Sequence, residues 1–293
     1  MKKTILLLVI LLVCMTIFAK EEVIKKRFEA TPAQPVSVSF RDADGDLRVE
    51  TYDGNEIILE FVKSIGGDPG GSTLEYFNGI KPQTAFADNR LEVKVEYPKI
   101  HFPFNLFHDY RLKVRSLLKV PRKCSLETHI VDGNVEAEGG EGNFSAHLTD
   151  GDVLLRDWHG DMDVGSTDGD LTLENVVGRL HCRTTDGDVT ATGKFSAVNF
   201  SSSDGNGEFR FLEGSRLSGD CEFRCSDGDL TLAFPKDMSF RLNAHTSEGG
   251  IHSALHFDRV DLEKKHHLEA ARGDAAYSLS IETSDGDVHI TEY

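Results

Sequence analysis

The sequence predicts an all-β protein built as a two-sheet parallel β-solenoid, and two observations lead to this fold class. The first is a tripeptide, Asp-Gly-Asp or Asp-Gly-Asn, whose central glycine returns every 18 residues along much of the chain. The second is an alternation of apolar and polar residues on both sides of each glycine, which is the period of a β-strand. Short fixed periods are typical of solenoids, in which each repeat buries its apolar face by stacking on its neighbours.

Five glycines at a spacing of 18 residues mark the regular part of the repeat: Gly133, Gly151, Gly169, Gly187 and Gly205. The series continues at wider spacing with Gly228, Gly249 and Gly286, and an early copy surrounds Gly45. A weaker glycine falls nine residues out of phase, at Gly142, Gly160 and Gly178. Each coil is therefore expected to hold two strands and two turns, with successive coils stacked about 4.8 Å apart.

The alternation also predicts which side chains point into the core. They stand seven and five residues before each turn glycine, and two and four residues after it. In the coil around Gly169 they are Met162, Val164, Leu171 and Leu173, and the later two positions around Gly249 hold Ile251 and Ser253. Residues between them, such as Arg156 and Glu174, are expected to face solvent.

Residues 1–19 are expected to be a secretory signal peptide. Lys2 and Lys3 precede an apolar run from Ile5 to Ala19, and charged residues follow it. Two alternatives are an uncleaved anchor and a lipid attached at Cys14. The mature chain is therefore expected to be exported to the periplasm, the cell surface or the extracellular space, without a transmembrane span.

The rest of the chain divides into two expected regions. Residues 20–123 begin with the rhythm of the repeat and then change to longer strands at 57–61 and 91–95, with a glycine-rich loop at 66–71. We predict that they form a β-rich N-terminal region or cap. Residues 124–293 are expected to be the solenoid, interrupted near 257–275 by an insertion that the pattern leaves open between a helix and a long hairpin.

The chain also resembles a known family. A strand that ends in Val120-Pro121-Arg122, followed by repeated Thr/Ser-x-Gly-Asp-Val coils, resembles the family known as DUF4097 or "putative adhesin". The segment from Ile281 to Val288 is similar to the end of that family's sequences. The resemblance implies a secreted or envelope β-solenoid and brings no catalytic motif with it.

Acidic residues flank the turn glycines, and they are the candidates for a metal site. Turn chemistry is the favoured interpretation, because Asp and Asn bond to turn backbone while Gly supplies a positive φ. The alternative is a Ca²⁺ ladder, because carboxylates that are repeated in every coil repel one another. Its candidate ligands are Asp150, Asp152, Asp168, Asp170, Asp186 and Asp188.

The cysteines are expected to be structural. Cys182, Cys221 and Cys225 fall in inward columns and are predicted to be buried free thiols, whereas Cys124 could be exposed.

Histidines pair up in outward columns of the repeat. His129 shares one column with His147, and His252 shares another with His289. Zinc needs three or four ligands, so we expect these histidines to be exposed residues and predict no metal site from them.

An aromatic stretch at 101–110 lies within a longer apolar insertion near 101–112. Its side chains Phe102, Phe104, Phe107 and Tyr110 either plug the open end of the core or form a contact patch for a partner. The plug is the favoured interpretation, since exposed ends of solenoids need a cap.

Charge and motifs limit the functions that the chain can have. A net charge of −17 argues against nucleic acid and favours cations or basic partners. The sequence lacks a Ser/His/Asp motif and a phosphate-binding loop. We therefore expect a non-catalytic surface or envelope interaction protein without a cofactor, whose partner is a protein or glycan. The alternatives are a Ca²⁺-stabilised binding rod and a carbohydrate-active β-helix enzyme.

Overall fold

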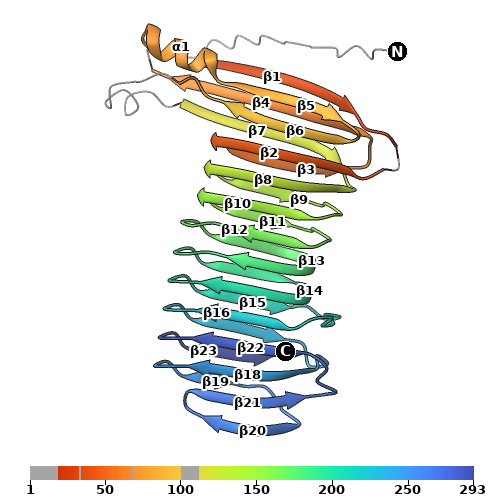
Figure 1. Cartoon of the computed structure of the whole chain (residues 1–293), viewed down its shortest axis with the longest axis vertical. Helices are drawn as coiled ribbons and strands as arrows, with labels where there is room; N and C mark the ends of the chain where they lie inside the picture. The colour runs from red at the N-terminus through yellow and green to blue at the C-terminus, as the bar shows by residue number, and fades with distance from the viewer. Residues whose placement is uncertain (1–18, 33, 68, 100–111) are drawn as a thin grey trace. The chain divides into compact units, whose positions relative to one another are not determined.

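The computed structural model describes residues 19–32, 34–67, 69–99 and 112–293. The chain divides into two compact units, Met1–Gly140 and Glu141–Tyr293. Strands dominate both units (Figure 1), so the prediction of an all-β protein is confirmed. The predicted signal peptide, apart from Ala19, lies outside the described residues, and so does the aromatic stretch at 101–110.

The first unit is built from two ladders of strands. One contains, in spatial order, β5 (Lys81–Ala87), β6 (Arg90–Glu96), β2 (Val36–Asp44) and β8 (Cys124–Asp132). The other contains β1 (Ala19–Glu29), β4 (Glu56–Gly66), β7 (Leu112–Pro121), β3 (Asp46–Tyr52) and β9 (Val135–Glu138). The coil around Gly45 stacks in parallel on the coil around Gly133, with Val38 opposite Leu126. The longer strands that the sequence predicts near 57–61 and 91–95 are present as parts of β4 and β6.

A short helix follows the glycine-rich loop of the first unit. Helix α1 spans Gly71–Gly79 and buries Phe77 completely. The fully buried Lys63 donates hydrogen bonds from Nζ to the carbonyl oxygens of Phe77 (2.7 Å) and Ile80 (2.9 Å), and it pairs with Glu22 at 3.3 Å. Because the last carbonyl groups of a helix lack partners within it, this lysine fixes the C-terminal end of α1.

The second unit continues the coil pattern in two further ladders. The first contains β10 (Phe144–Asp150), β12 (Met162–Gly165), the later halves of β13 (Leu171–Arg183) and β14 (Val189–Ser202), and β16 (Cys221–Cys225). The second contains β11 (Val153–Arg156), the earlier halves of β13 and β14, β15 (Gly207–Phe211) and β17 (Leu230–Phe234). These pairs are parallel, and their register repeats the period of the sequence, as in Phe144 opposite Met162 and Leu171 opposite Val189.

The predicted phase of the core is confirmed throughout the regular coils. Val164, Leu171 and Leu173 are 0 % exposed. The outward Arg156 and Glu174 form an ion pair at 2.6 Å on neighbouring coils. Ile251 and Ser253 are the exceptions, since Ile251 is only half-buried and Ser253 is exposed.

The turn glycines are required by the close approach of neighbouring coils. A Cβ atom on Gly187 would lie 1.9 Å from the carbonyl oxygen of Gly169. Gly151 has the expected positive φ of 144°. Gly187 does not have a positive φ, so the expectation is wrong for that glycine. None of the flanking aspartates in the described turns is left-handed either.

The C-terminal coils are not stacked in the order of the sequence, contrary to expectation. The last coil, β22 (Ser278–Thr283) and β23 (Val288–Glu292), lies between the coil of β16 and β17 and the coil of β18 (Phe240–Thr246) and β19 (Ile251–Ser253). It pairs in parallel with both neighbours. The terminal Tyr293 fastens it, because its hydroxyl group donates to the carbonyl oxygen of Phe211 at 2.5 Å.

The insertion near 257–275 forms a hairpin, not a helix. Its strands β20 (Arg259–Lys264) and β21 (His267–Arg272) are antiparallel, and β21 pairs antiparallel with β18 (Figure 1).

The strands of the second unit are therefore mixed in direction. In addition, β13 and β14 run from one ladder into the other, which joins the two ladders by hydrogen bonds. Two separate parallel sheets are therefore not established by the pairing alone.

Candidate functional site

In most coils the residue that follows the turn glycine is Asp or Asn, and its side-chain oxygen bonds to the neighbouring coil. Asp152 Oδ1 accepts a hydrogen bond from the backbone N–H of Asp170 at 2.9 Å, and Asp170 Oδ1 accepts one from Asp188 at 2.9 Å. The same bond joins three further pairs: Asp188 with Asn206, Asn206 with Asp229, and Asp229 with Asp287. Three of the Ca²⁺ candidates, Asp152, Asp170 and Asp188, thus use a carboxylate oxygen within the fold.

The acidic residue that precedes each turn glycine is exposed instead. Asp150, Asp168, Asp186 and Asp204 share this position on consecutive coils. Loss of water around the carboxyl group and repulsion from the carboxylates of Asp168 and Asp204 raise the pKa of Asp186. We call the exposed column of Asp150, Asp168, Asp186, Asp204, Asp227 and Asp285 the acidic edge.

The acidic edge offers carboxylates but not an evident cage for a metal. Within residues 19–32, 34–67, 69–99 and 112–293, no group of three or more His, Cys, Asp or Glu side chains is arranged to hold a metal ion. Ca²⁺ binding by the six candidate aspartates therefore stays an untested alternative to turn chemistry.

A column of buried hydroxyl groups, which the expected core did not include, stands three residues before the turn glycine. Thr184 Oγ1 accepts a hydrogen bond from the N–H of Gly187 at 3.1 Å. Thr246 Oγ1 accepts one from Gly249 (3.1 Å) and donates one to the carbonyl oxygen of Gly286 (3.2 Å). Recurrent Ser and Thr at an inward position were the available signal in the sequence. These bonds tie each turn to itself and to the next coil.

Cys225 takes a position in this hydroxyl column. Its Sγ lies 3.2 Å from the carbonyl oxygen of Gly205 and accepts from the N–H of Gly228 at 3.2 Å. The thiol therefore makes the hydrogen bonds that a serine or threonine hydroxyl group makes in other coils, in addition to packing as an apolar side chain.

All four cysteines in the described chain are free and buried. Burial raises the pKa of Cys124 and of Cys221 to about 12. Cys124 is 1 % exposed, so the suggestion that it could reach solvent is wrong. Because the thiolate is the reactive form, these thiols are inert at neutral pH.

His252 and His289 lie on neighbouring strands, β19 and β23, as their shared column predicts. The rings of His252 and His289 stack with their centroids 5.1 Å apart. His147 Nε2 lies 3.6 Å from an oxygen of Asp163, and His129 Nδ1 lies 3.9 Å from one of Glu127.

In the first unit, a buried carboxyl group takes the position that the hydroxyl column has in the second. Asp42, three residues before Gly45, is 6 % exposed, and its Oδ1 accepts a hydrogen bond from the hydroxyl group of Tyr97 at 2.6 Å. Its Oδ2 is buried without a hydrogen-bond partner among the described residues. Burial accordingly raises the pKa of Asp42, and we expect this group to cost stability when it is ionised.

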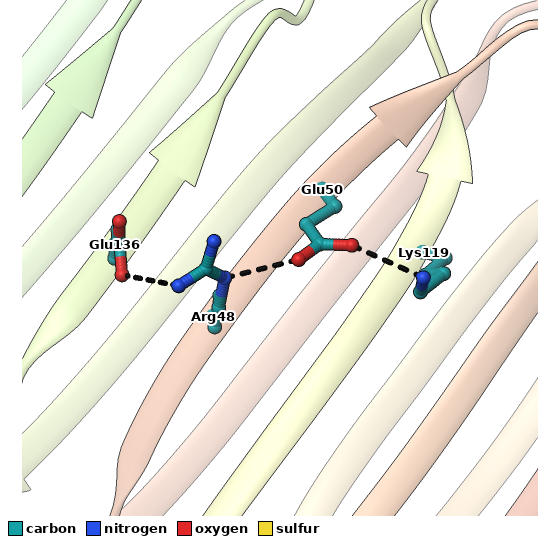
Figure 2. Close-up of polar contacts among 4 residues, drawn as sticks. All are labelled: Arg48, Glu50, Lys119 and Glu136. Carbon is teal, nitrogen blue, oxygen red and sulfur yellow. Dashed lines mark hydrogen bonds and ion pairs between the residues drawn. The ribbon is translucent and has the colours of Figure 1, made fainter.

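A row of charges crosses the outer face of the first unit (Figure 2). Arg48 lies between two carboxylates, with its Nη1 3.2 Å from Glu136 and its Nε 3.0 Å from Glu50. Lys119 reaches the other oxygen of Glu50 at 3.2 Å. The Lys119 ammonium group holds the pKa of Glu50 below its usual range, against the smaller opposing effect of burial. All four groups are partly exposed, so each pair contributes at most about 1 kcal/mol.

A shallow groove of about 620 Å³ lies beside this row of charges. Arg48 and Glu136 line it together with the apolar Val23, Val62 and Leu117. It is a second exposed surface of mixed character in the first unit. The contact residues proposed from the sequence, Phe102, Phe104, Phe107 and Tyr110, lie outside the described residues and cannot be placed on either surface.

Comparison with known proteins gives a family and a fold. A family model described as Toastrack DUF4097 matches residues 122–216 and 206–291. No curated protein sequence matches the chain. Among the described residues, no helix has the length and apolar character needed to cross a membrane.

Several solved structures are similar in fold. One from Parabacteroides distasonis, named a "putative adhesin", is 11 % identical with a TM-score of 0.50, over 93 % of this chain and 97 % of that one. One from Bacteroides fragilis, also named a "putative adhesin", is 13 % identical with a TM-score of 0.49, over 93 % and 97 %. A second Parabacteroides distasonis structure, named a "putative lipid binding protein", is 12 % identical with a TM-score of 0.48, over 92 % and 96 %. At these identities the likeness concerns the fold alone.

Proposed function

Since the chain belongs to the Toastrack DUF4097 family, we propose that it is an exported interaction protein of the cell envelope or cell surface. It binds its partner without catalysing a reaction and without a cofactor. In the proposed arrangement, the repeat forms a two-sheet parallel β-solenoid that displays the acidic edge. The name "putative adhesin", given to proteins of similar fold, agrees with this role.

One observation carries the proposal: the repeated polar side chains divide between the fold and the surface. The column of Asp152, Asp170 and Asp188 bonds to backbone, and the hydroxyl column is buried. The carboxylates of the acidic edge are exposed in coil after coil. Asp152, Asp170 and Asp188 are exposed too, but one oxygen of each is bonded to the next coil. A regular row of like charges favours multivalent contact with a basic partner, because each coil adds one weak interaction.

Binding to isolated cell envelopes tests the role of the acidic edge. We expect the mature protein to sediment with envelopes at low salt, and the triple variant Asp168→Asn, Asp186→Asn, Asp204→Asn to lose most of that binding. The matched control is Glu208→Gln, Glu213→Gln, Asp237→Asn, which removes the same charge from exposed sites off the edge.

Cell fractionation tests the location. Accumulation of the protein in the cytosol would contradict the proposal, and so would equal binding by the two triple variants.

A Ca²⁺-stabilised rod is a second candidate, favoured by the raised pKa of Asp186. Repulsion from Asp168 and Asp204 contributes to that shift, and a bound cation would relieve it. If the edge is not a Ca²⁺ site, about 2 mM Ca²⁺ raises the melting temperature no more than Mg²⁺ does at equal ionic strength. A large rise specific to Ca²⁺ would favour the second candidate.

A further inference from the structure

The two ladders of the second unit do not end together. One continues from β18 through β21 to β20 (Figure 1). The other ends at β19, which pairs with β23 on one side and, in the described chain, with no strand on the other. The hairpin of β20 and β21 therefore extends past the last strand of the facing ladder.

The inner face of this hairpin is partly uncovered. Val260 stands opposite Ala270, so both side chains are on the same face of the hairpin. Ala270 is 1 % exposed and Leu268 is 4 % exposed, which marks this face as the continuation of the core. Val260 is nevertheless 48 % exposed. The end of the ladder also explains why Ile251 and Ser253 are less buried than their counterparts in other coils.

A groove of about 630 Å³ occupies the space between the hairpin and β19. Ile251, Leu255, Phe257, Val260 and Leu268 supply its apolar lining. We call it the terminal groove.

One wall of the terminal groove is a backbone edge with pairing capacity. Val288 donates to the carbonyl oxygen of Gly250 (2.9 Å), and Ala254 donates to that of Ile290 (2.8 Å). Because backbone groups alternate in direction along a strand, the N–H and C=O of Ser253 point away from β23. On that side, within the part of the chain that the structure describes, only the N–H of Ile251 is used, by the carbonyl oxygen of Lys265 at 3.1 Å.

The other exposed edge, β20, is protected against pairing. An ion pair between Arg259 and Asp261, at 2.9 Å, lies on it. Its register is also broken between Val260 and Leu262. Charged side chains and β-bulges keep edge strands from pairing with other chains. A further strand is therefore expected to add at β19 and not at β20.

The charge of the terminal groove is opposite to that of the protein. Its charged lining residues are Glu263, Lys264 and Lys265, which leave one positive charge in a chain of net charge −17. The two lysines therefore favour an acidic ligand at this place.

We propose that the terminal groove binds an extended, acidic segment of a partner protein, which adds to β19 as a further strand. The segment bonds to the backbone of Ser253, places apolar side chains on Val260 and Leu268, and directs a carboxylate to Lys264 and Lys265. Strand addition of this kind takes affinity from backbone bonds and specificity from alternate side chains. The site differs from the acidic edge, and its opposite charge selects a different partner chemistry.

A synthetic peptide with the right alternation tests the proposal. The probe is fluorescein-labelled Glu-Val-Thr-Val-Asp-Val, and its binding to the purified mature chain is measured by fluorescence anisotropy. We expect Ser253→Pro, which removes the N–H at the free edge, to weaken binding at least about tenfold. Ser253→Ala, which keeps that N–H, should bind like the wild type.

Two further variants separate the apolar contact from general effects. Val260→Glu should also weaken binding at least about tenfold, because it places a charge in the apolar lining and repels the acidic peptide. Val131→Glu is the matched control, since Val131 is a similarly exposed valine in the first unit, at 54 %. Circular-dichroism melting establishes that each variant is folded.

Three results would overturn the proposal. The first is that the labelled peptide shows no binding when the protein is titrated to about 1 mM, a concentration at which a millimolar Kd is still detected. The second is equal binding by Ser253→Pro and Ser253→Ala. The third is displacement of the peptide by dodecanoate together with unchanged binding by Ser253→Pro, which would make the groove a lipid site. None of these measurements involves the acidic edge, so their failure leaves the envelope-binding test intact.

Discussion

The coil around Gly169 and the coil around Gly249 carry the same pattern but lie in different surroundings. Leu171 and Leu173 are 0 % exposed, because strands pair on both sides of β13. Ile251 and Ser253, at the same positions of the repeat, are half-buried and exposed. The position of a residue in the repeat sets the direction of its side chain, whereas the neighbouring coil decides whether that side chain is buried.

The largest expected difference is between the same substitution in the two coils. Leu171→Asp buries an unpaired carboxylate and should destabilise the protein by more than about 4 kcal/mol, which unfolds most domains of this kind. Ile251→Asp should cost less than about 1.5 kcal/mol, because its side chain reaches water. Urea unfolding measures both variants. Equal losses would mean that the open end of the ladder is covered in solution.

Glycine substitutions should give the next largest contrast. Gly187→Ala should cost about 3 kcal/mol, since its Cβ would overlap a backbone carbonyl oxygen that cannot move alone. Gly250→Ala should cost under about 1 kcal/mol, because its nearest contact is the end of the His252 side chain at 3.0 Å. Thermal melting of the two variants compares them. If Gly187→Ala lowered stability no more than Gly250→Ala does, neighbouring coils would be able to move apart slightly with little loss of free energy.

The hydroxyl column should behave alike in a regular coil, the one around Gly187, and in the coil around Gly249. Such a result would assign the difference in burial to the ladder that ends at β19. Thr184→Ala and Thr246→Ala should each cost about 2 kcal/mol, because each leaves a buried glycine N–H without a partner. Thr246 is 0 % exposed although its coil is near the end of the second unit's stack. Its strand, β18, is covered because β21 pairs with it on the outer side. Denaturant titrations in which Thr246→Ala costs far less than Thr184→Ala would mean that both ladders are open at that end.

The smallest contrast is between two aspartates of one turn. Asp170→Ala removes the acceptor for the N–H of Asp188 and should cost about 1 kcal/mol. Asp168→Ala removes an exposed like charge and should be neutral or slightly stabilising at pH 7. High-precision melting curves measure the difference. A larger loss at Asp168 would assign a structural partner, such as a cation, to the acidic edge.

The sequence predicts the coils well because period and burial depend on local pattern. Met162, Leu171 and Cys182 are buried as their phase requires. The order of the last coils was not predictable, since Leu230 pairs with Val288 across a separation that no periodicity encodes. The two roles of the flanking aspartates were also hidden, because Asp168 and Asp170 look alike in sequence and differ only in what their oxygens reach.

The inserted C-terminal coil has a consequence for the time at which the protein becomes complete. Synthesis delivers β18 and β19 before β22 and β23, yet the later strands lie between them and β16 and β17. Until Ser278–Glu292 has emerged, the hairpin end has no neighbour to stack on, and four strand edges lack their final partners. A chain that lacks Ser278–Glu292 therefore leaves the coil of β18 and β19 without the neighbour on which it stacks. The last coil thus makes the stacking of the hairpin end depend on strands that are synthesised after it.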